Sequence, residues 1–308
     1  MSRRTLVLGV VLACIGLPAL AVIAAAASHY VANRATGTIV SSGKERPYIV
    51  HLPPGYDPAK PTPLVISLHG ALGWPSIQMK VTGWNRVADE HGFIAVYPAG
   101  QGGATRVWYQ QGASNPSRMP DVVFISELID KLAATYNIDP ARIYANGFSN
   151  GGGMSFALSC TLSHRIAAIG AVGAANTLPW AWCSDRTPVP MIAFHGTGKR
   201  EVPYHGGKAL IWKGGEFPSI PEWTAKWARR NGCGATPADS RVRPDVMRRE
   251  YSGCAKDATV VLYTIEDGGH TWPGGAEEVS EWLLGRHSRS IDASETMWAF
   301  FREHPLRR

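Results

Sequence analysis

The stretch Ile143-Tyr144-Ala145-Asn146-Gly147-Phe148-Ser149-Asn150-Gly151-Gly152-Gly153-Met154 joins an apolar, strand-like run to a helix-like run through a serine flanked by glycines. A strand that turns into a helix so abruptly strains the backbone of its central residue, and only glycine leaves room two positions to either side. The turn presents the hydroxyl of that residue at the end of the strand. The pattern therefore predicts Ser149 as a nucleophile.

Short apolar runs alternate with helix-like segments along the rest of the chain. The expected strands are residues 46–52, 64–68, 93–98, 143–146, 166–172, 191–194, 247–253 and 260–265. The expected helices are residues 77–91, a helix that begins at Pro120, and residues 151–160, 219–232 and 294–303. This alternation predicts an α/β fold with a mostly parallel sheet flanked by helices, whose ligand site lies at the carboxyl ends of the strands.

Two further glycine-rich turns fall at that same edge of the predicted sheet. His69-Gly70-Ala71-Leu72-Gly73 follows the strand at 64–68, and such a turn points backbone N–H groups at a ligand, although it is also what a plain strand-to-helix turn looks like. Gly268-Gly269-His270-Thr271-Trp272 follows the last strand, so His270 is placed to reach toward Ser149.

The N-terminus has the pattern of an export signal. Arg3 and Arg4 precede an apolar run that ends in alanines near residue 27. Residues 1–27 are therefore expected to be a cleaved signal or an uncleaved anchor, with lipidation at Cys14 and a twin-arginine route as further alternatives. Residues 28–44 are expected to be a linker and residues 45–308 the catalytic domain. Every one of these routes predicts a secreted or cell-envelope protein.

An oxidising compartment allows the remaining four cysteines to form disulfides. Pairing of neighbours would join Cys160 to Cys183 and Cys233 to Cys254. Three connectivities are possible on sequence alone, and four buried free thiols are the alternative.

Several motifs together resemble the α/β-hydrolases of the secreted polyhydroxybutyrate depolymerase and feruloyl esterase type, over roughly residues 44–304. The matching pieces are Leu68-His69-Gly70, Asp121-Val122, Gly147-Phe148-Ser149-Asn150-Gly151-Gly152, His195-Gly196-Thr197 with Val202-Pro203-Tyr204, Trp227 with Asn231-Gly232-Cys233, and Gly269-His270-Thr271-Trp272-Pro273-Gly274.

The resemblance implies a role for each of these matching positions. Ser149 would be the nucleophile and His270 the base. The N–H groups of Asn150 and Ala71 would form the oxyanion hole, and His69 and Trp272 would line the substrate cleft.

The acid of the expected serine–histidine–acid triad departs from the family pattern. The family has an aspartate two residues after the threonine of His195-Gly196-Thr197, and this chain has Lys199 there. A lysine cannot accept the imidazole N–H of the base. Glu201 is the nearest carboxylate and the expected substitute; Asp267, Asp185 or no acid at all are the alternatives.

We therefore expect an exported serine esterase that hydrolyses a polyhydroxyalkanoate-type polyester, or feruloyl or acetyl esters of polysaccharide, through an acyl-enzyme on Ser149. The alternative suggested by Lys199 is an impaired hydrolase-fold protein that binds such material. The ester substrate is the expected partner, and membrane contact is expected only through residues 1–27.

Other classes of function have weak support in the sequence. The ten histidines lack a spacing typical of metal ligands, and no glycine cluster has the Lys-Ser/Thr ending of a phosphate loop, so neither metal nor cofactor is expected. The formal net charge is +7. The internal basic cluster, Arg241, Arg243, Arg248 and Arg249, lacks the interleaved aromatic residues that stack on bases, so no nucleic-acid partner is expected.

Overall fold

The computed structural model describes residues 35–103, 106–108, 119–175, 180, 183, 185, 187–198, 201–208, 216–276 and 281–307. Residues 36–308 form one compact unit. The predicted export segment at 1–27 and the position of Lys199 lie outside the described residues. Within those residues, no helix combines the length and apolar character needed to cross a membrane.

The main sheet of this unit has ten strands in the order β1-β2-β4-β3-β5-β6-β7-β12-β11-β10. Its strands are β1 (Gly37–Ser41), β2 (Lys44–His51), β3 (Thr62–Leu68), β4 (Ile94–Pro98), β5 (Ile138–Phe148), β6 (Ala168–Val172), β7 (Met191–Gly196), β10 (Ala238–Arg243), β11 (Val246–Tyr251) and β12 (Val260–Ile265). Strands β4, β3, β5, β6, β7 and β12 are mutually parallel, and the outer strands pair antiparallel. A small separate hairpin pairs β8 (Gly207–Lys208) with β9 (Glu216–Phe217).

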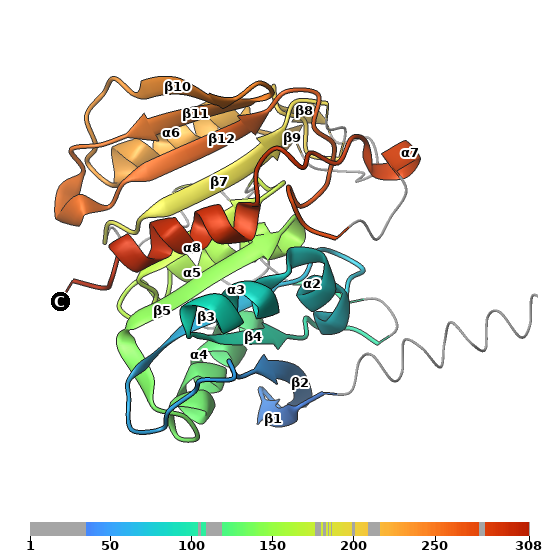
Figure 1. Cartoon of the computed structure of the whole chain (residues 1–308), viewed down its shortest axis with the longest axis vertical. Helices are drawn as coiled ribbons and strands as arrows, with labels where there is room; N and C mark the ends of the chain where they lie inside the picture. The colour runs from blue at the N-terminus through green and yellow to red at the C-terminus, as the bar shows by residue number, and fades with distance from the viewer. Residues whose placement is uncertain are drawn as a thin grey trace, which may run out of the picture. The chain divides into compact units, whose positions relative to one another are not determined.

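Helices cover both faces of the sheet (Figure 1). They are α2 (Pro75–Thr82), α3 (Trp84–His91), α4 (Pro120–Ala133), α5 (Asn150–Ser159), α6 (Ile220–Arg230), α7 (Glu281–Leu284) and α8 (Ala293–Glu303). One apolar cluster joins one sheet face to α4, α5 and α6, and a second joins the other face to α3 and α8. The predicted α/β-hydrolase architecture is thus confirmed.

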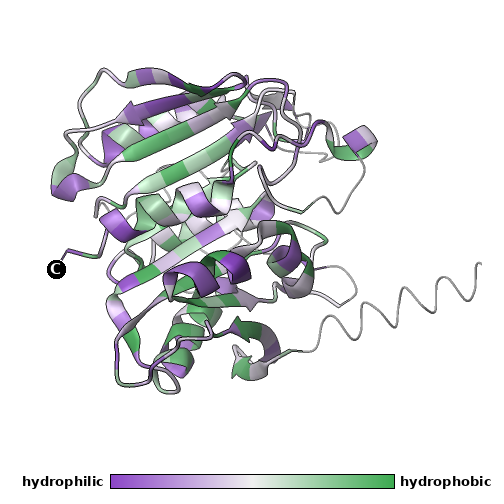
Figure 2. Cartoon of the chain, viewed as in Figure 1, coloured by the Kyte–Doolittle hydropathy of each residue, from purple (hydrophilic) through white to green (hydrophobic). Residues whose placement is uncertain are grey.

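Burial on both faces explains why the central strands are apolar throughout. Every residue of β3, β4 and β6 is buried, as expected for parallel strands between two helical layers. Figure 2 shows the neighbouring strands β7 and β12 largely in green and the edge strands β10 and β11 with more purple. The arginines of the predicted basic cluster lie on β10 and β11, where Arg249 pairs with Asp239, and Arg241 with Glu266. Charged side chains on an edge strand discourage further strand pairing.

The sequence misplaced three boundaries. Strand β1 lies inside residues 28–44, which were expected to be a linker; it pairs only with β2 and most of its residues are not fully buried, so it shows no strong apolar alternation. The helix expected at 77–91 is two helices, because Gly83 adopts φ 65° between α2 and α3. Strand β5 begins at Ile138, and Asp139-Pro140 lies where its register against β3 shifts.

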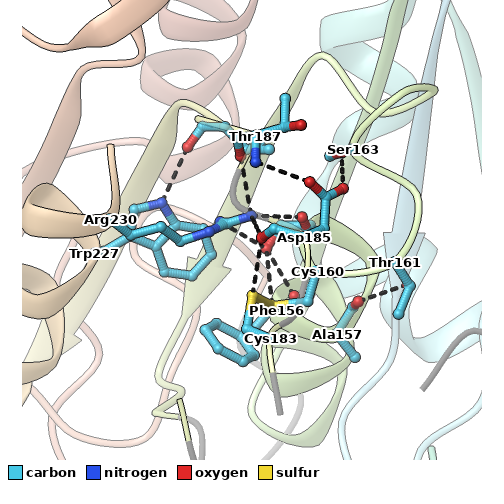
Figure 3. The surroundings of a disulfide bond; sticks show 12 residues. Phe156, Ala157, Cys160, Thr161, Ser163, Cys183, Asp185, Thr187, Trp227 and Arg230 are labelled. Carbon is cyan, nitrogen blue, oxygen red and sulfur yellow. Dashed lines mark hydrogen bonds between the residues drawn. A yellow bond between two sulfur atoms is a disulfide. The ribbon is translucent and has the colours of Figure 1, made fainter. Parts of the chain in front are cut away.

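Two disulfides join neighbouring cysteines, Cys160 to Cys183 and Cys233 to Cys254, which decides between the connectivities that the sequence left open. Figure 3 shows Arg230 and Asp185 around the first of them. Arg230 of α6 donates to the carbonyl oxygens of Ser159 and Asp185 at 2.8 and 3.3 Å. Burial lowers the pKa of Arg230 to about 10. The side chain therefore ties α6 to the end of α5 and to the disulfide-bonded loop.

Candidate active site

Ser149 occupies the turn between β5 and α5 with φ 51° and ψ −116°, a backbone conformation that non-glycine residues rarely adopt. The surrounding glycines are required by close packing. A Cβ on Gly147 would lie 2.2 Å from the carbonyl carbon of Gly151, and a Cβ on Gly151 would lie 2.2 Å from the carbonyl oxygen of Leu68. The Ser149 N–H donates to Val172 O of β6 at 2.9 Å, which fixes the turn against the sheet.

The turn after β3 lies directly beside Ser149. A Cβ on Gly70 would be 3.5 Å from the Ser149 Cβ. The next residues are positioned by backbone bonds, because Leu72 N–H donates to Arg106 O at 2.7 Å and Gly73 N–H to Gly70 O at 3.1 Å. Ala71, which lies between Gly70 and Leu72 in the sequence, lines the same cavity as Ser149. The sequence-predicted pair of oxyanion donors, Ala71 and Asn150, therefore comes from two segments that meet at this serine.

Asn150 is the first residue of α5, so its N–H lies at the N-terminal, positive end of the helix. The side chain of Asn150 is engaged with Trp108: its Oδ1 accepts from the Trp108 N–H at 2.7 Å and its Nδ2 donates to Trp108 O at 3.1 Å. The Trp108 indole N–H donates in turn to His69 O at 2.9 Å. These bonds connect the first turn of α5 to the turn after β3.

His69 is a neutral, positioned imidazole. Its Nε2 accepts the N–H of Gly100 at 2.9 Å, so Nδ1 carries the proton and donates to Gly70 O at 2.7 Å. Burial lowers the pKa of His69 to about 4, with smaller contributions from the positive charges of Arg106 and Arg46. His69 therefore supports the turn and has no free nitrogen in this arrangement with which to act as a base.

The segment that contacts His69 is held by a buried ion pair. Arg46 of β2 donates to Ala99 O at 2.9 Å and to the Asp121 carboxylate at 2.7 Å. Both side chains are almost completely buried. Removing one partner of such a pair typically costs about 3–5 kcal/mol of unfolding free energy. Arg46 and Asp121 thus fix the Ala99–Gly100 segment on which the tautomer of His69 depends.

His270 lies on the loop after β12. Its N–H donates to Leu284 O at 2.5 Å, and a Cβ on the preceding Gly269 would be 2.1 Å from that same oxygen. The imidazole is buried and lies 4.7 Å, centroid to centroid, from the Phe148 ring at a tilt of 31°. Packing on the residue before Ser149 therefore orients the predicted base.

One cavity of about 290 Å³ brings together most of the residues that the sequence singled out. They are His69, Ala71, Ser149, His270 and Trp272. Trp272 is buried and also lines the cavity. Its indole N–H donates to Ser294 Oγ at 3.0 Å. Apolar residues of α2 and α7, including Ile77, Val81 and Leu284, complete much of the wall.

A family model for esterase PHB depolymerases matches residues 46–177, which include the His69 turn and Ser149. Over these residues the chain is similar to the esterase PHB depolymerase family. Feruloyl esterase B of Piromyces equi is 31% identical over 73% of this chain, which spans 42% of that protein's length. Feruloyl esterase C of Emericella nidulans is 27% identical over 73% of this chain and 76% of its own.

Solved structures show the same fold. The acetyl xylan esterase from Aspergillus awamori superposes with a TM-score of 0.61 at 13% identity, over 86% of this chain and 98% of its own. At that level of identity the likeness concerns the fold alone. The family model does not extend to His270. The fold of the chain brings this residue to the cavity that contains Ser149.

The loop after β7, where the sequence resemblance leads us to expect the acid, packs closely on the His270 loop. Thr197 N–H donates to Ile265 O at 2.9 Å and Gly198 N–H to Gly268 O at 3.0 Å. A Cβ on Gly196 would be 2.0 Å from Gly268 O. The described end of this loop at Gly198 therefore lies next to the loop that bears His270, and Lys199 is outside the described residues.

The three candidate acids occupy different places. Glu201 is half-buried on the turn after β7 and is not among the described residues that line the cavity. The Asp267 side chain is exposed. Asp185 accepts hydrogen bonds from Ser163 Oγ and from the Thr187 N–H beside the first disulfide. Burial would raise its pKa, but these bonds leave the pKa of Asp185 below its ordinary value.

Two polar residues of the cavity wall, Gln78 and His287, were not found from the sequence. Gln78 lines the cavity together with Ile77 and Val81 of the same helix, so the helical spacing of these residues was a weak indication of its place. Nothing in the sequence around His287 indicates that it lines the cavity. His287 Nε2 donates to Trp272 O at 2.9 Å. Both residues reach the site only through tertiary packing.

Among the described residues, one trio of possible metal ligands comes together, Glu90, His91 and Glu295. Arg86 donates to Glu90 at 3.0 Å and lies 3.6 Å from Glu295, so a positive charge already balances these carboxylates. None of these residues lines the cavity that contains Ser149.

The lowered pKa of His69 predicts a specific loss of stability in acid. Because its pKa is about 4 in the folded chain and near 6.5 in the unfolded chain, the unfolded state binds more protons between these values. The stability due to neutral His69 is complete above pH 6.5 and falls, by about 3 kcal/mol in total, as the pH drops to 4. Urea unfolding of the wild type and of His69→Phe across this range measures the difference in slope.

His164→Gln is the matched control, because His164 is exposed. Its unfolding free energy should follow the wild-type pH dependence, whereas the curve of His69→Phe should be flatter. Parallel curves for the wild type and His69→Phe would contradict the assignment of a buried neutral imidazole.

Proposed function

We propose that this chain is an exported serine esterase that hydrolyses carboxylic esters through an acyl-enzyme on Ser149. The single observation that carries the proposal is the meeting of three segments in one cavity: the strained turn at Ser149, the turn at Gly70-Ala71 and the loop of His270. Esterase relatives support the reaction class, and the proposed serine mechanism comes from this geometry.

In the first half of the reaction, Ser149 Oγ attacks the ester carbonyl carbon while His270 takes the hydroxyl proton. The carbonyl oxygen becomes an oxyanion that the N–H groups of Asn150 and Ala71 stabilise. The N-terminus of α5 adds a partial positive charge at this point. Collapse of the intermediate breaks the bond to the alkoxy oxygen, which leaves as the alcohol with the proton from His270.

In the second half, water replaces the alcohol. His270 takes a proton from the water as its oxygen attacks the acyl carbon, and the same two N–H groups hold the second oxyanion. The bond to Ser149 Oγ then breaks, Oγ regains the proton from His270, and the carboxylic acid leaves.

The proposed substrates are a polyhydroxyalkanoate-type polyester or feruloyl or acetyl esters of polysaccharide. The mostly apolar cavity suits an acyl group of modest size. Export is supported by the two disulfides, which persist in oxidising compartments. Glu201 is proposed as the acid that orients His270, in place of the aspartate that Lys199 replaces.

A second candidate function follows from Lys199. Without an acid to orient and charge-balance His270, the fold would bind esters and turn them over poorly, because loss of the triad acid typically lowers turnover by about 10⁴. Such a protein would retain the cavity and the oxyanion donors. Reactivity of Ser149 separates the two functions.

A fluorophosphonate probe should label the purified protein at Ser149. Labelling should disappear in Ser149→Ala and slow strongly in His270→Ala, because the serine loses its base. Gel fluorescence and peptide mapping read out the site. A wild-type protein that neither labels nor hydrolyses short-chain esters would refute the esterase and favour the binding protein.

The acid can be tested by a pair of substitutions at the loop after β7. If Glu201 orients His270, Glu201→Gln should lower kcat for 4-nitrophenyl butanoate by about 10²- to 10⁴-fold with little change in KM. Lys199→Asp should then change kcat little. The opposite pattern, an unaffected Glu201→Gln and a faster Lys199→Asp, would show that the enzyme works without its acid.

A further inference from the structure

Residues 284–288 run alongside the loop after β12 that carries His270, and we call them the clamp segment. Three backbone N–H groups of the loop donate to carbonyl oxygens of the clamp segment at 2.5 to 2.9 Å, those of Gly269, His270 and Gly274. The acceptors are the oxygens of Arg286, Leu284 and Ser288, respectively. The backbone is therefore held on both sides of the proposed base.

Close packing leaves the loop little room to move toward the clamp segment. A Cβ on Gly269 would lie 2.1 Å from Leu284 O, and a Cβ on Gly285 would lie 2.8 Å from the Gly269 Cα. Gly285 has φ 79°, in the left-handed region that favours glycine. The two glycines thus bring the backbone of the clamp segment into direct contact with the residue before His270.

The clamp segment also contacts the loop through a buried side chain. His287 Nε2 donates to the carbonyl oxygen of Trp272 at 2.9 Å, two residues after His270. The Nδ1 atom of His287 is buried and has no hydrogen-bond partner among the described residues. A proton on Nδ1 would be a buried donor without an acceptor, so the imidazole is neutral and serves as a single donor. Neither half of the proposed hydrolysis uses this imidazole.

The clamp segment is itself anchored by two carboxylates. The Glu281 carboxylate accepts the His287 N–H at 2.8 Å. The Asp245 carboxylate accepts from Arg286 at 2.9 Å and from Ser288 Oγ at 3.0 Å. Asp245 lies in the turn between β10 and β11, so the clamp segment is tied to the sheet independently of the loop that it holds.

The loop after β7, where the acid is expected, contacts a different part of the His270 loop. The Gly198 N–H donates to Gly268 O at 3.0 Å, which lies before the base in the sequence. The clamp segment instead holds Gly269 and the residues that follow it. The backbone position of His270 therefore depends on the clamp segment, whichever residue acts as the acid.

From these contacts we propose that the clamp segment positions the base, and that His287 is a positioning residue for hydrolysis. The bond from His287 to Trp272 O and the contact of Gly285 with Gly269 hold the backbone around His270 while its imidazole takes and returns a proton. The inference rests on the proposed esterase function and deepens it by naming residues outside the triad on which the rate depends.

The first test removes the side-chain donor of the clamp segment. His287→Leu should lower kcat for 4-nitrophenyl acetate by about ten- to a hundredfold with little change in KM, because a displaced base slows the chemistry without weakening substrate binding. Fluorophosphonate labelling of Ser149 should slow to a similar extent. His287→Gln keeps a donor at the end of its side chain and should retain most of the wild-type kcat.

His304→Leu is the matched control. The Nδ1 of His304 donates to Phe300 O at 2.7 Å, and His304 is not among the described residues that line the cavity. The control loses the same kind of bond, so it should lower the thermal unfolding midpoint and keep the wild-type kcat below that midpoint. Equal losses of kcat in His304→Leu and His287→Leu would identify a general effect of stability and overturn the positioning role.

The second test acts on the backbone contact. Gly285→Ala places a Cβ 2.8 Å from the Gly269 Cα, so it should lower kcat as His287→Leu does. Gly253→Ala is the matched control: Gly253 has a φ of 65°, but a Cβ there meets nothing within 4 Å. Both alanines strain the backbone and should lower the unfolding midpoint, whereas only Gly285→Ala should lose kcat. An unchanged kcat in Gly285→Ala, or a loss that appears in KM alone, would overturn the proposal.

Amide hydrogen exchange of the wild type decides the question if the variants do not fold. The N–H groups of Gly269, His270 and Gly274 should exchange slowly, as hydrogen-bonded backbone in a stable part of the fold does. Fast exchange at all three would overturn the clamp and leave the esterase intact. If Ser149→Ala hydrolyses the ester at the wild-type rate, the proposed function itself fails and the inference fails with it.

Discussion

The close approach of α5 to the ends of β3 and β5 is the constraint on which the rest of the site depends. At Gly147 and Gly151 the backbones lie so near one another that no Cβ fits. This contact forces the positive φ of Ser149 and brings the first N–H of α5 beside the turn at Gly70 and Ala71. The positions of the proposed nucleophile and of the proposed oxyanion donors therefore depend on the same close packing.

Polar groups buried around this contact are fixed by donors and acceptors whose roles are unambiguous. The Gly100 N–H sets the tautomer of His69, and the Trp84 indole sets the amide of Asn146. In both cases, the hydrogen bonds that a side chain already makes determine which of its polar atoms can still bind a ligand at the cavity wall. His69 has no free nitrogen to act as a base, and Gln78 is oriented by its bond to Ser67 Oγ. The same buried network thus supports the fold and positions the side chains at the cavity wall.

The sequence predicted those features that depend on local pattern. The buried parallel strands, the turn at Ser149 and the loop of His270 each have a signal within about ten residues, and their meeting follows from the geometry of parallel sheets. The pairing of the cysteines was limited to a few choices, and the fold selected among them. Strand β1 was missed because an edge strand with one partner needs little apolar alternation.

Gln78 and His287 were missed because their roles depend on partners 11 and 15 residues away in sequence and on loops that only the fold brings together. The acid of the triad is a different case. The sequence showed that Lys199 stands where the resemblance leads us to expect the aspartate. Whether Glu201, another carboxylate or no acid takes that role depends on the path of the loop after β7.

The most direct test of the central claim is the mass of the enzyme during turnover. Acid quenching within seconds of mixing with 4-nitrophenyl butanoate, followed by peptide mass spectrometry, should find a butanoyl group on Ser149, formed with a burst of nitrophenolate near one equivalent. An acyl group on another residue, or an unmodified enzyme that consumes the ester at the same rate as Ser149→Ala, would contradict the account.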